Sequence, residues 1–332
     1  MAIWRRVQRT GGGSFSVTLP KSWAQRHGVR EGSMISVKVN EDGSLKLVPE
    51  GVQAKPAAAE IVVRDSSTVT RDIIGGYLLG FDTIVAESSS PFTSEALRSL
   101  RQTVRRLVGA EIVEELPQKV VVKVLLDPRA VAPEIVLRRE AALVYRMIID
   151  SVNALVESNV PLARAVSERD EEVDRQYFTL VRMIRSAIRS PDVGREGRLS
   201  RLRLLDLRLA ARLLEDSGDE ASSLGQDVAG SSGLAPGLGV VKTLRRLGET
   251  VVELTREATA AFLAEDHALT VNVISRYQEF APQMAAAERE AAQADPQVRG
   301  LLSKALARLE HMAANAYDMA ELVSPAAVKH PP

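Results

Sequence analysis

The stretch after Pro133 restricts the fold of this chain more than any other feature, because nothing in it is typical of a β-strand. Apolar residues recur there at helical spacing, and only short breaks rich in Pro, Gly, Asn and Asp interrupt them. We therefore expect an all-α domain over residues 128–324. Its six predicted helices cover about residues 134–158, 161–189, 197–228, 237–264, 268–294 and 296–322.

The six predicted helices divide into two sets of three, residues 134–228 and residues 237–323. The last helix of each set carries a comparable segment, which is 214–221 in the first set and 309–316 in the second. A tandem repeat of three-helix bundles is therefore expected.

The composition narrows the class of protein. A chain of 332 residues is long enough for one to three domains. The absence of cysteine excludes disulfides, thiolate metal sites, iron–sulfur clusters and cysteine nucleophiles. No apolar run is long enough to cross a bilayer and no apolar leader opens the chain, so we expect a cytoplasmic protein without membrane insertion.

The 43 basic and 43 acidic residues cancel in total, but six basic residues and no acidic residue precede Glu31. Alternating patterns predict four strands in residues 1–50, and a short helix after Pro20 that ends before Gly28. The strands are expected at residues 3–9, 15–19, 34–39 and 45–48. A unit this small, without disulfides, buries too little surface alone, so a homodimer through residues 1–50 is expected.

Residues 3–49 carry four spaced features: Arg5-Arg6-Val7-Gln8, Gly11-Gly12-Gly13-Ser14, Val17-Thr18-Leu19-Pro20-Lys21, and Gly28-Val29-Arg30-Glu31-Gly32-Ser33. Together they resemble the AbrB/MazE/SpoVT family of swapped-hairpin DNA-binding domains. The resemblance implies an intertwined dimer that presents its basic first strand and the following loop to double-stranded DNA. The expected DNA-binding residues are Arg5, Arg6, Gln8, Arg9, Gly12, Ser14, Ser16, Lys21 and Arg26.

Other interpretations of this segment are weaker. The glycine run lies between two strands of one unit, which disfavours a flexible linker. A phosphate-binding P-loop would need glycine at the positions of Phe15 and Pro20. One alternative stays open, in which the arginines only solvate a dimer surface. In the DNA-binding interpretation, the glycines let backbone N–H groups approach phosphates that the basic side chains neutralise.

Residues 51–59 have the composition of a tether, and residues 60–127 predict a small α/β domain. Its elements follow the order strand, helix, strand, helix, strand, strand. No catalytic constellation is visible in it, and its function is not predicted. The fold class expected for the chain is α+β overall, with a dimeric swapped-hairpin β domain, this α/β domain and an all-α tandem bundle.

Two pairs of acidic residues stand out in the first set of helices. Asp170 and Asp174 lie four residues apart on one helix, and Glu215 and Asp219 on the next, so each pair shares a helix face. Antiparallel neighbours bring such pairs together, and clustered carboxylates repel unless they are protonated or bind cations. Oxygen ligands suit Mg²⁺, Mn²⁺, Ca²⁺ or ferric iron. The alternative is a solvated acidic helix face.

The runs 168–175 and 214–219, which contain these acids, resemble the two motifs of PhoU, a family of phosphate-uptake regulators. The resemblance covers roughly residues 134–323 and implies metal binding by the acids of both runs. The order of the whole chain, a swapped-hairpin unit followed by an α/β segment and a tandem PhoU bundle, resembles the archaeal phosphate-uptake regulators of that architecture.

The second set of helices departs from this pattern. Placing Leu162 on Leu269 sets Tyr277 opposite Asp170 and Ala281 opposite Asp174. In the third helix of that set, an alanine at position 314 replaces the second acid. At most one intact metal site per chain is therefore expected.

These features predict a DNA-binding transcriptional regulator of phosphate uptake, which senses its signal through a metal-binding bundle. The role in phosphate uptake is inferred from the resemblance to PhoU alone. Two alternatives stay open. One is a cytoplasmic adaptor that contacts a phosphate transporter subunit and uses the N-terminal unit for dimerisation, and the other is an antitoxin-like partner. An enzyme is not expected, because the four histidines are scattered and none is placed with a nucleophile and a carboxylate.

Overall fold

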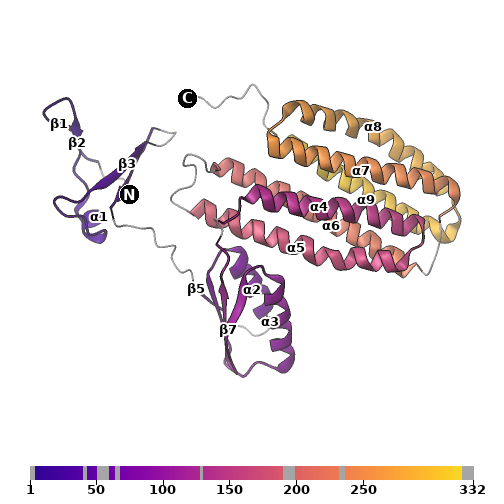
Figure 1. The fold of residues 1–332 in the computed structure, drawn as a ribbon, viewed down its shortest axis with the longest axis horizontal. Helices are drawn as coiled ribbons and strands as arrows, with labels where there is room; N and C mark the ends of the chain where they lie inside the picture. The colour runs from indigo at the N-terminus through magenta and orange to yellow at the C-terminus, as the bar shows by residue number, and fades with distance from the viewer. Residues whose placement is uncertain are drawn as a thin grey trace. The chain divides into compact units, whose positions relative to one another are not determined.

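The computed structural model describes residues 4–39, 43–50, 60–63, 68–127, 130–189, 199–231 and 236–323. The chain divides into two compact units, one formed by the N-terminal residues up to 57 and one that begins at residue 58 (Figure 1). The segment 51–59, which the sequence predicts to be a tether, lies outside the described residues.

The N-terminal unit has the predicted order of two strands, a short helix and two strands. These elements are β1 (Gln8–Arg9), β2 (Phe15–Ser16), α1 (Lys21–Arg26), β3 (Ile35–Val39) and β4 (Leu45–Pro49). β1 pairs with β2 and β3 pairs with β4, both antiparallel. Gly12 and Gly13 in the first turn have φ angles of 89° and 91°, which side-chain-bearing residues rarely adopt. The first two strands are shorter than predicted, since only two residue pairs form between them.

The α/β domain also has its predicted order. Its elements are β5 (Glu60–Val63), α2 (Val69–Leu78), β6 (Thr83–Glu87), α3 (Ser94–Arg106), β7 (Ala110–Leu116) and β8 (Lys119–Val124). The strands form one sheet in the order β5-β6-β8-β7, in which only β5 and β6 are parallel. α2 and α3 bury their apolar residues against this sheet, in a core centred on Ile73, Tyr77, Leu100 and Val122.

The helical half contains six long helices within the described residues, close to the predicted limits (Figure 1). They are α4 (Pro133–Val156), α5 (Val160–Arg189), α6 (Arg201–Gly230), α7 (Leu238–Ala264), α8 (His267–Ala292) and α9 (Pro296–Glu321). Asp266 and Asp295 cap α8 and α9 by accepting hydrogen bonds from backbone N–H groups of the first turn. Among the described helices, none is long and apolar enough to cross a membrane.

The two sets of three helices share an internal ion pair. Arg169 on α5 donates to Asp150 on α4 over 2.8 Å, and Arg276 on α8 donates to Glu257 on α7 over 2.6 Å. Both pairs span 19 residues, so a single shift along the chain superposes one on the other. The same shift places Leu162 on Leu269, and the structure therefore supports the residue-by-residue alignment of the first two helices of the two repeats.

A buried arginine joins the α/β domain to the first repeat. Arg182 on α5 is 1% exposed, and its guanidinium donates to the carbonyl oxygens of Tyr77 and Phe81 and to the carboxylate of Asp82. These oxygens lie at or just beyond the end of α2, where the negative end of the helix dipole favours a cation. The α/β domain is thus held on α5 at a fixed point.

Candidate functional sites

α5 and α6 bring the two acidic pairs of the first repeat to the same level of the bundle. Gly218 lies between the two acids of α6, and a Cβ atom there would meet Val173 of α5 at 3.2 Å and Val144 of α4 at 3.7 Å. The three helices therefore approach closely at this glycine. Because Val173 directly precedes Asp174, the acids of α5 lie beside those of α6.

Burial raises the pKa values of all four carboxyl groups, and neighbouring carboxylates add to the effect. The pKa of Asp170 rises to about 6, first because the group is removed from water and then because Asp219 and Asp174 lie nearby. The pKa of Glu215 rises to about 7, again through burial first and then through Asp219. Burial also raises the pKa values of Asp174 and Asp219. We refer to these four residues as the acid cluster.

Two arginines contact the acid cluster. Arg106, from the end of α3, donates to the Asp174 carboxylate over 3.1 Å and lies 3.9 Å from Glu171. Arg212, one turn before Glu215 on α6, donates to the carboxylate of that residue. Partial neutralisation by these cations opposes the repulsion among the carboxylates. Arg106 comes from the α/β domain and is not among the site residues predicted from the sequence.

A fifth acid, Glu140 on α4, is also absent from the site residues predicted from the sequence. It is fully buried, and neither of its carboxylate oxygens has a hydrogen-bond partner. Burial, followed by the charge of Glu215, raises its pKa well above the ordinary value. The signal in the sequence is an acid at a core position, since Val136, Leu137 and Val144 share its helix face and are buried.

The second repeat replaces the acid cluster with aromatic and small residues. Tyr277 takes the place of Asp170, and its ring packs on that of Tyr317 with 4.9 Å between the centroids. Tyr317 in turn aligns with Ser222, which hydrogen-bonds Asp170 in the first repeat. The same pair of positions is therefore in contact in both repeats. Glu310, which aligns with Glu215, is exposed.

The oxygen atoms of the acid cluster are of the chemical type that binds a hard cation, but their present positions do not form a coordination site. Carboxylate oxygens are the ligands that such ions prefer, and the orphaned oxygens of Glu140 add unsatisfied donors beside them. Within the described part of the chain, no three Asp, Glu or His side chains are arranged so that they could hold a metal ion. Binding would thus require side chains to turn toward a shared point.

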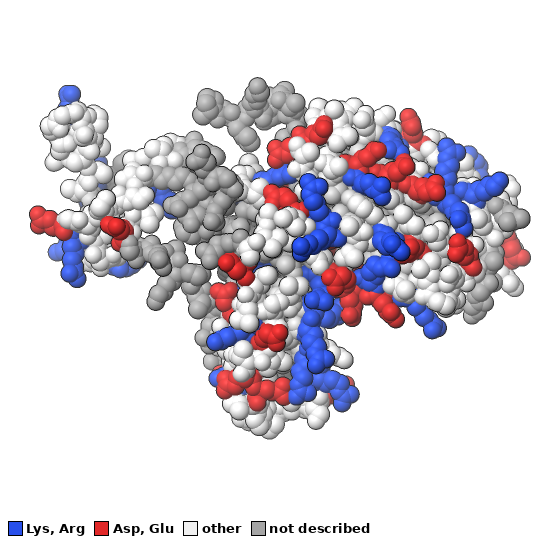
Figure 2. All heavy atoms as spheres, viewed as in Figure 1, with Lys and Arg blue, Asp and Glu red and all other residues white. Residues whose placement is uncertain are grey.

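All nine predicted DNA-binding residues are on the surface of the N-terminal unit. Gln8 and Arg9 form β1, the turn contains Gly12 and Ser14, and α1 carries Lys21 and Arg26. On the face of the molecule drawn in Figure 2, by contrast, basic and acidic side chains intermingle over the helical half. An extended basic surface is thus not visible on that face of the bundle.

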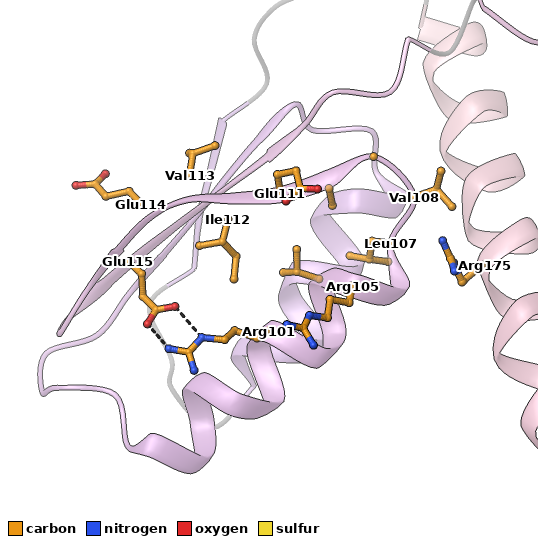
Figure 3. Close-up of a pocket in the computed structure, with 13 residues that line it drawn as sticks. Arg101, Arg105, Leu107, Val108, Glu111, Ile112, Val113, Glu114, Glu115 and Arg175 are labelled. Carbon is orange, nitrogen blue, oxygen red and sulfur yellow. Dashed lines mark hydrogen bonds and ion pairs between the residues drawn. The ribbon is translucent and has the colours of Figure 1, made fainter.

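A hollow of about 600 Å³ lies in the second unit between α3, β7 and one residue of α5 (Figure 3). Its charged lining is balanced, with three arginines and three glutamates. Arg101 donates to Glu115 across it over 3.0 Å, and Lys119 pairs with Glu114. The balance of charges does not select an anionic or a cationic ligand.

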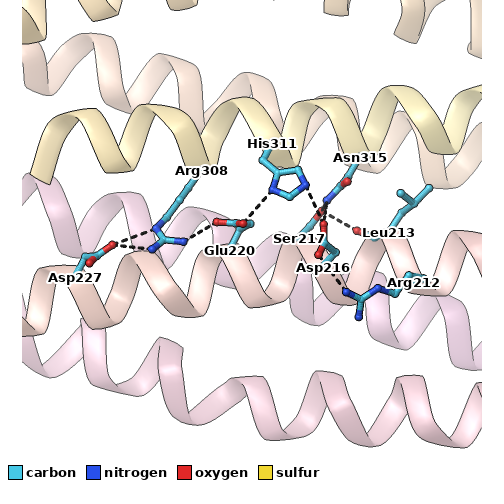
Figure 4. Close-up of polar contacts among 9 residues, drawn as sticks. All are labelled: Arg212, Leu213, Asp216, Ser217, Glu220, Asp227, Arg308, His311 and Asn315. Atoms are coloured by element: carbon cyan, nitrogen blue, oxygen red, sulfur yellow. Dashed lines mark hydrogen bonds and ion pairs between the residues drawn. The ribbon is translucent and has the colours of Figure 1, made fainter.

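A polar network joins the two repeats along α6 and α9 (Figure 4). The ring of His311 lies 3.1 Å from Asp216 and 3.0 Å from Glu220, which also accepts from Arg308 over 2.7 Å. Asn315 donates to Asp216 over 3.0 Å. The residues of this network hold one another, and their evident role is to join the two repeats.

Two protein families match parts of the chain. The model of the MazE antitoxin family, described as antidote-toxin recognition MazE, bacterial antitoxin, matches residues 8–53. The model of the PhoU domain matches residues 137–228, which is the repeat that carries the acid cluster. No curated protein matches the chain.

Solved structures resemble the helical half. The crystal structure of PhoU from Pseudomonas aeruginosa is similar over 57% of this chain and 93% of that chain, with 23% sequence identity and a TM-score of 0.52. The phosphate transport system regulatory protein PhoU from Streptococcus pneumoniae covers 57% of this chain and 91% of its own, with 14% identity and a TM-score of 0.49. The first likeness shows a PhoU-like fold.

The two matched families are families of regulatory proteins, and the matches indicate no catalytic family. The chain combines a MazE/AbrB-like domain at its N-terminus with a PhoU domain in its helical half, as the sequence analysis expects. A PhoU domain indicates a role in the regulation of phosphate transport, and a MazE/AbrB-like domain suggests binding of DNA or of a toxin-like protein.

Proposed function

We propose that the protein is a dimeric DNA-binding regulator of phosphate uptake, in which a cation bound by the first PhoU repeat is the signal. The observation that carries the proposal is the fusion of a basic MazE/AbrB-like unit with a PhoU domain. The N-terminal unit binds DNA, and the PhoU domain supplies a cation site whose occupancy changes with the state of the cell.

The surface of the N-terminal unit supports DNA binding. Basic and hydroxyl side chains on β1, β2 and α1 are exposed, and the glycine turn allows close approach of the backbone to phosphates. Neutralising phosphates releases counterions, so the affinity for duplex DNA should fall steeply with salt. Replacing Arg5, Arg6 and Arg9 with Ala should weaken binding and flatten the salt dependence.

The same unit supports dimerisation. Pro49 is its single buried residue among those described. Large apolar side chains that a stable monomer would bury are exposed instead, and they include Trp4, Phe15, Val37 and Val39. A second copy that covers these side chains would supply the core that one copy lacks.

The acid cluster supports cation binding. Four carboxyl groups with raised pKa values repel one another, and a bound cation would remove this repulsion and stabilise the fold. Asp170, Asp174, Glu215 and Asp219 would hold a hard ion such as Mg²⁺, Mn²⁺, Ca²⁺ or Fe³⁺. The ion would supply positive charge at the α5–α6 face, and the second repeat would hold none.

Thermal melting of the full chain in chelator and then in added Mg²⁺, Mn²⁺, Ca²⁺ or Fe³⁺ tests the cation site. A hundredfold excess over Kd should stabilise the fold by about 2.7 kcal/mol. Asp174→Asn with Asp219→Asn should abolish this rise, and Glu310→Gln, the matched change in the second repeat, should preserve it. A parent that melts at the same temperature with every ion has no such site.

The affinity of the full chain for duplex DNA tests the regulatory role. We expect the full chain to bind duplex DNA at physiological salt. Its affinity for DNA should change when the cation is removed, because a cation that favours one conformation of the protein also shifts the equilibrium of DNA binding. The alternative that the MazE match favours is an antitoxin-like role, and a further alternative is an adaptor that contacts a phosphate transporter subunit. A dimer that binds no DNA at any salt concentration, but captures a toxin or a phosphate transporter subunit, would support that alternative.

A further inference from the structure

Glu140 on α4 is an ionisable group that the four-residue site does not use. It is fully buried, and the residues around it on the same helix face are apolar. Removing a carboxyl group from water without a hydrogen-bond partner costs several kcal/mol, and native proteins rarely leave such groups unsatisfied. Both oxygens of Glu140 are nevertheless without a partner.

The packing of the first repeat places Glu140 beside the acid cluster. Val144 of α4 and Gly218 of α6 lie at one level, since a Cβ atom on the glycine would meet the valine at 3.7 Å. α4 and α6 are the first and third helices of an up-down bundle and run in the same direction. One turn earlier on both helices, Glu140 therefore lies at the level of Glu215, which is 8% exposed.

The second repeat shows which kind of side chain packs at the position of Glu140 when no acid cluster is present. The shift that superposes Asp150 on Glu257 places Glu140 on Leu247, which is buried in the core between the helices. Leucine satisfies the same place in the fold without any polar atom. The acid is thus present in the repeat that has the acid cluster and absent from the repeat that lacks it.

We propose that Glu140 is a fifth ligand of the cation, which it binds from the interior of the bundle. The proposal rests on the proposed cation site and extends it from two helices to three. α5 and α6 supply the four outer carboxylates, and α4 closes the inner side of the coordination sphere, where buried surroundings exclude water. The two orphaned oxygens of Glu140 are then satisfied when a hard, oxygen-preferring cation is bound.

Two substitutions in the full chain separate ligation from packing. Glu140→Leu installs the residue of the second repeat, and Glu140→Gln keeps the shape of the side chain while removing its charge. The probe is Mn²⁺ alone, titrated into metal-free protein at one pH and followed by calorimetry. The midpoint of thermal unfolding is measured in chelator and in Mn²⁺. Glu310→Gln serves as the matched control, because it removes a carboxylate from the exposed position that aligns with Glu215.

In chelator, Glu140→Leu should melt at the same temperature as the parent or higher, since it replaces an unsatisfied buried carboxyl group with an apolar side chain. Glu140→Gln should melt close to the parent, because its neutral amide is also buried without a partner. The Kd of both variants for Mn²⁺ should rise at least about tenfold, as expected when a ligand-sphere contact is lost, and the stabilisation by Mn²⁺ should shrink accordingly. Glu310→Gln should bind Mn²⁺ like the parent.

Two other results would overturn the proposal and differ in their meaning. If the parent binds Mn²⁺ and both Glu140 variants bind it with the same Kd, then Glu140 is not a ligand, while the four-residue site stands. If the parent shows no binding of Mn²⁺ and no change in melting with Mg²⁺, Ca²⁺ or Fe³⁺, then the cation site and the role of Glu140 both fall.

Discussion

The guanidinium of Arg106 donates to the carboxylate of Asp174 over 3.1 Å, although 68 residues separate them in the sequence. Arg106 ends α3 of the α/β domain, and Asp174 belongs to the acid cluster on α5 of the bundle. A protein cation therefore already occupies one of the carboxylates that we propose as metal ligands. Any ion that binds there competes with the contact between the two domains.

Removal of Arg106 should tighten cation binding. Arg106→Gln eliminates the competing guanidinium, and we expect the Kd for Mn²⁺ to fall about three- to fivefold, in line with the modest strength of a half-exposed ion pair. Arg105→Gln is the matched control, because it removes the same charge from a neighbouring, exposed position of α3. If both substitutions change the Kd equally, then the effect comes from the overall charge of α3 and not from the contact between Arg106 and Asp174.

The metal-free protein should lose stability as the pH rises from about 4.5 to 7. The pKa values of Asp170 and Glu215 are raised to about 6 and about 7, so the folded state holds more protons than the unfolded state across this range. The stability from these groups is complete below their ordinary pKa values and is lost as the pH passes through the raised ones.

Denaturant unfolding in chelator at several pH values measures this loss. Glu215→Gln should flatten the profile by on the order of 1–2 kcal/mol between pH 4.5 and 7, after allowance for solvent screening. Glu310→Gln should leave the slope unchanged, because that residue is exposed. Parallel profiles for the parent and Glu215→Gln would show that the carboxyl group titrates normally.

The sequence predicts the helical half well because its signals are local. Pro296 and the capping aspartates at 266 and 295 mark where helices begin, and the apolar spacing sets their length. The acid pairs on α5 and α6 follow from the same local periodicity. Strand lengths in the N-terminal unit are predicted less well, because the alternating pattern marks every residue that suits a strand whether or not a partner strand pairs with it.

The environment of Glu140 and the contact of Arg106 depend on which helices pack together. The sequence of a single helix does not predict that packing. Glu140 could be recognised in the sequence as an acid within an apolar stripe, but its nearness to Glu215 follows only from the parallel packing of α4 and α6. Arg106 looks like its exposed neighbours on α3. Its partner becomes visible once Arg182 fixes the α/β domain on α5.

Arg182→Met should destabilise the α/β domain selectively. The substitution keeps an apolar stem in the core but removes the guanidinium that donates to the Phe81 carbonyl and the Asp82 carboxylate, at a cost of about 2–3 kcal/mol. Hydrogen exchange of the amides of α2 should accelerate, while that of α7 to α9 should stay constant. Arg185→Met, on the same helix, is the control, and an equal acceleration in that variant would argue against a specific anchor.

The hairpin of β3 and β4 should be the contact through which two chains associate. Val37 pairs with Leu47 and Val39 with Leu45, so these side chains share one apolar face, while Ser36 lies on the other. Val37, Val39 and Leu45 are exposed in the single chain. Burying this face against a second copy removes apolar surface from water, at roughly 25 cal/mol per Å².

Val37→Lys in the full chain should therefore convert the dimer to a monomer at micromolar concentration, as measured by sedimentation equilibrium. Ser36→Lys adds the same charge to the opposite face of the same strand and should leave the dimer intact. DNA affinity should fall together with dimerisation in the Val37 variant, because two linked half-sites bind far more tightly than one. If both variants stay dimeric, another surface joins the chains; if both become monomeric, charge in this strand rather than the apolar face governs association.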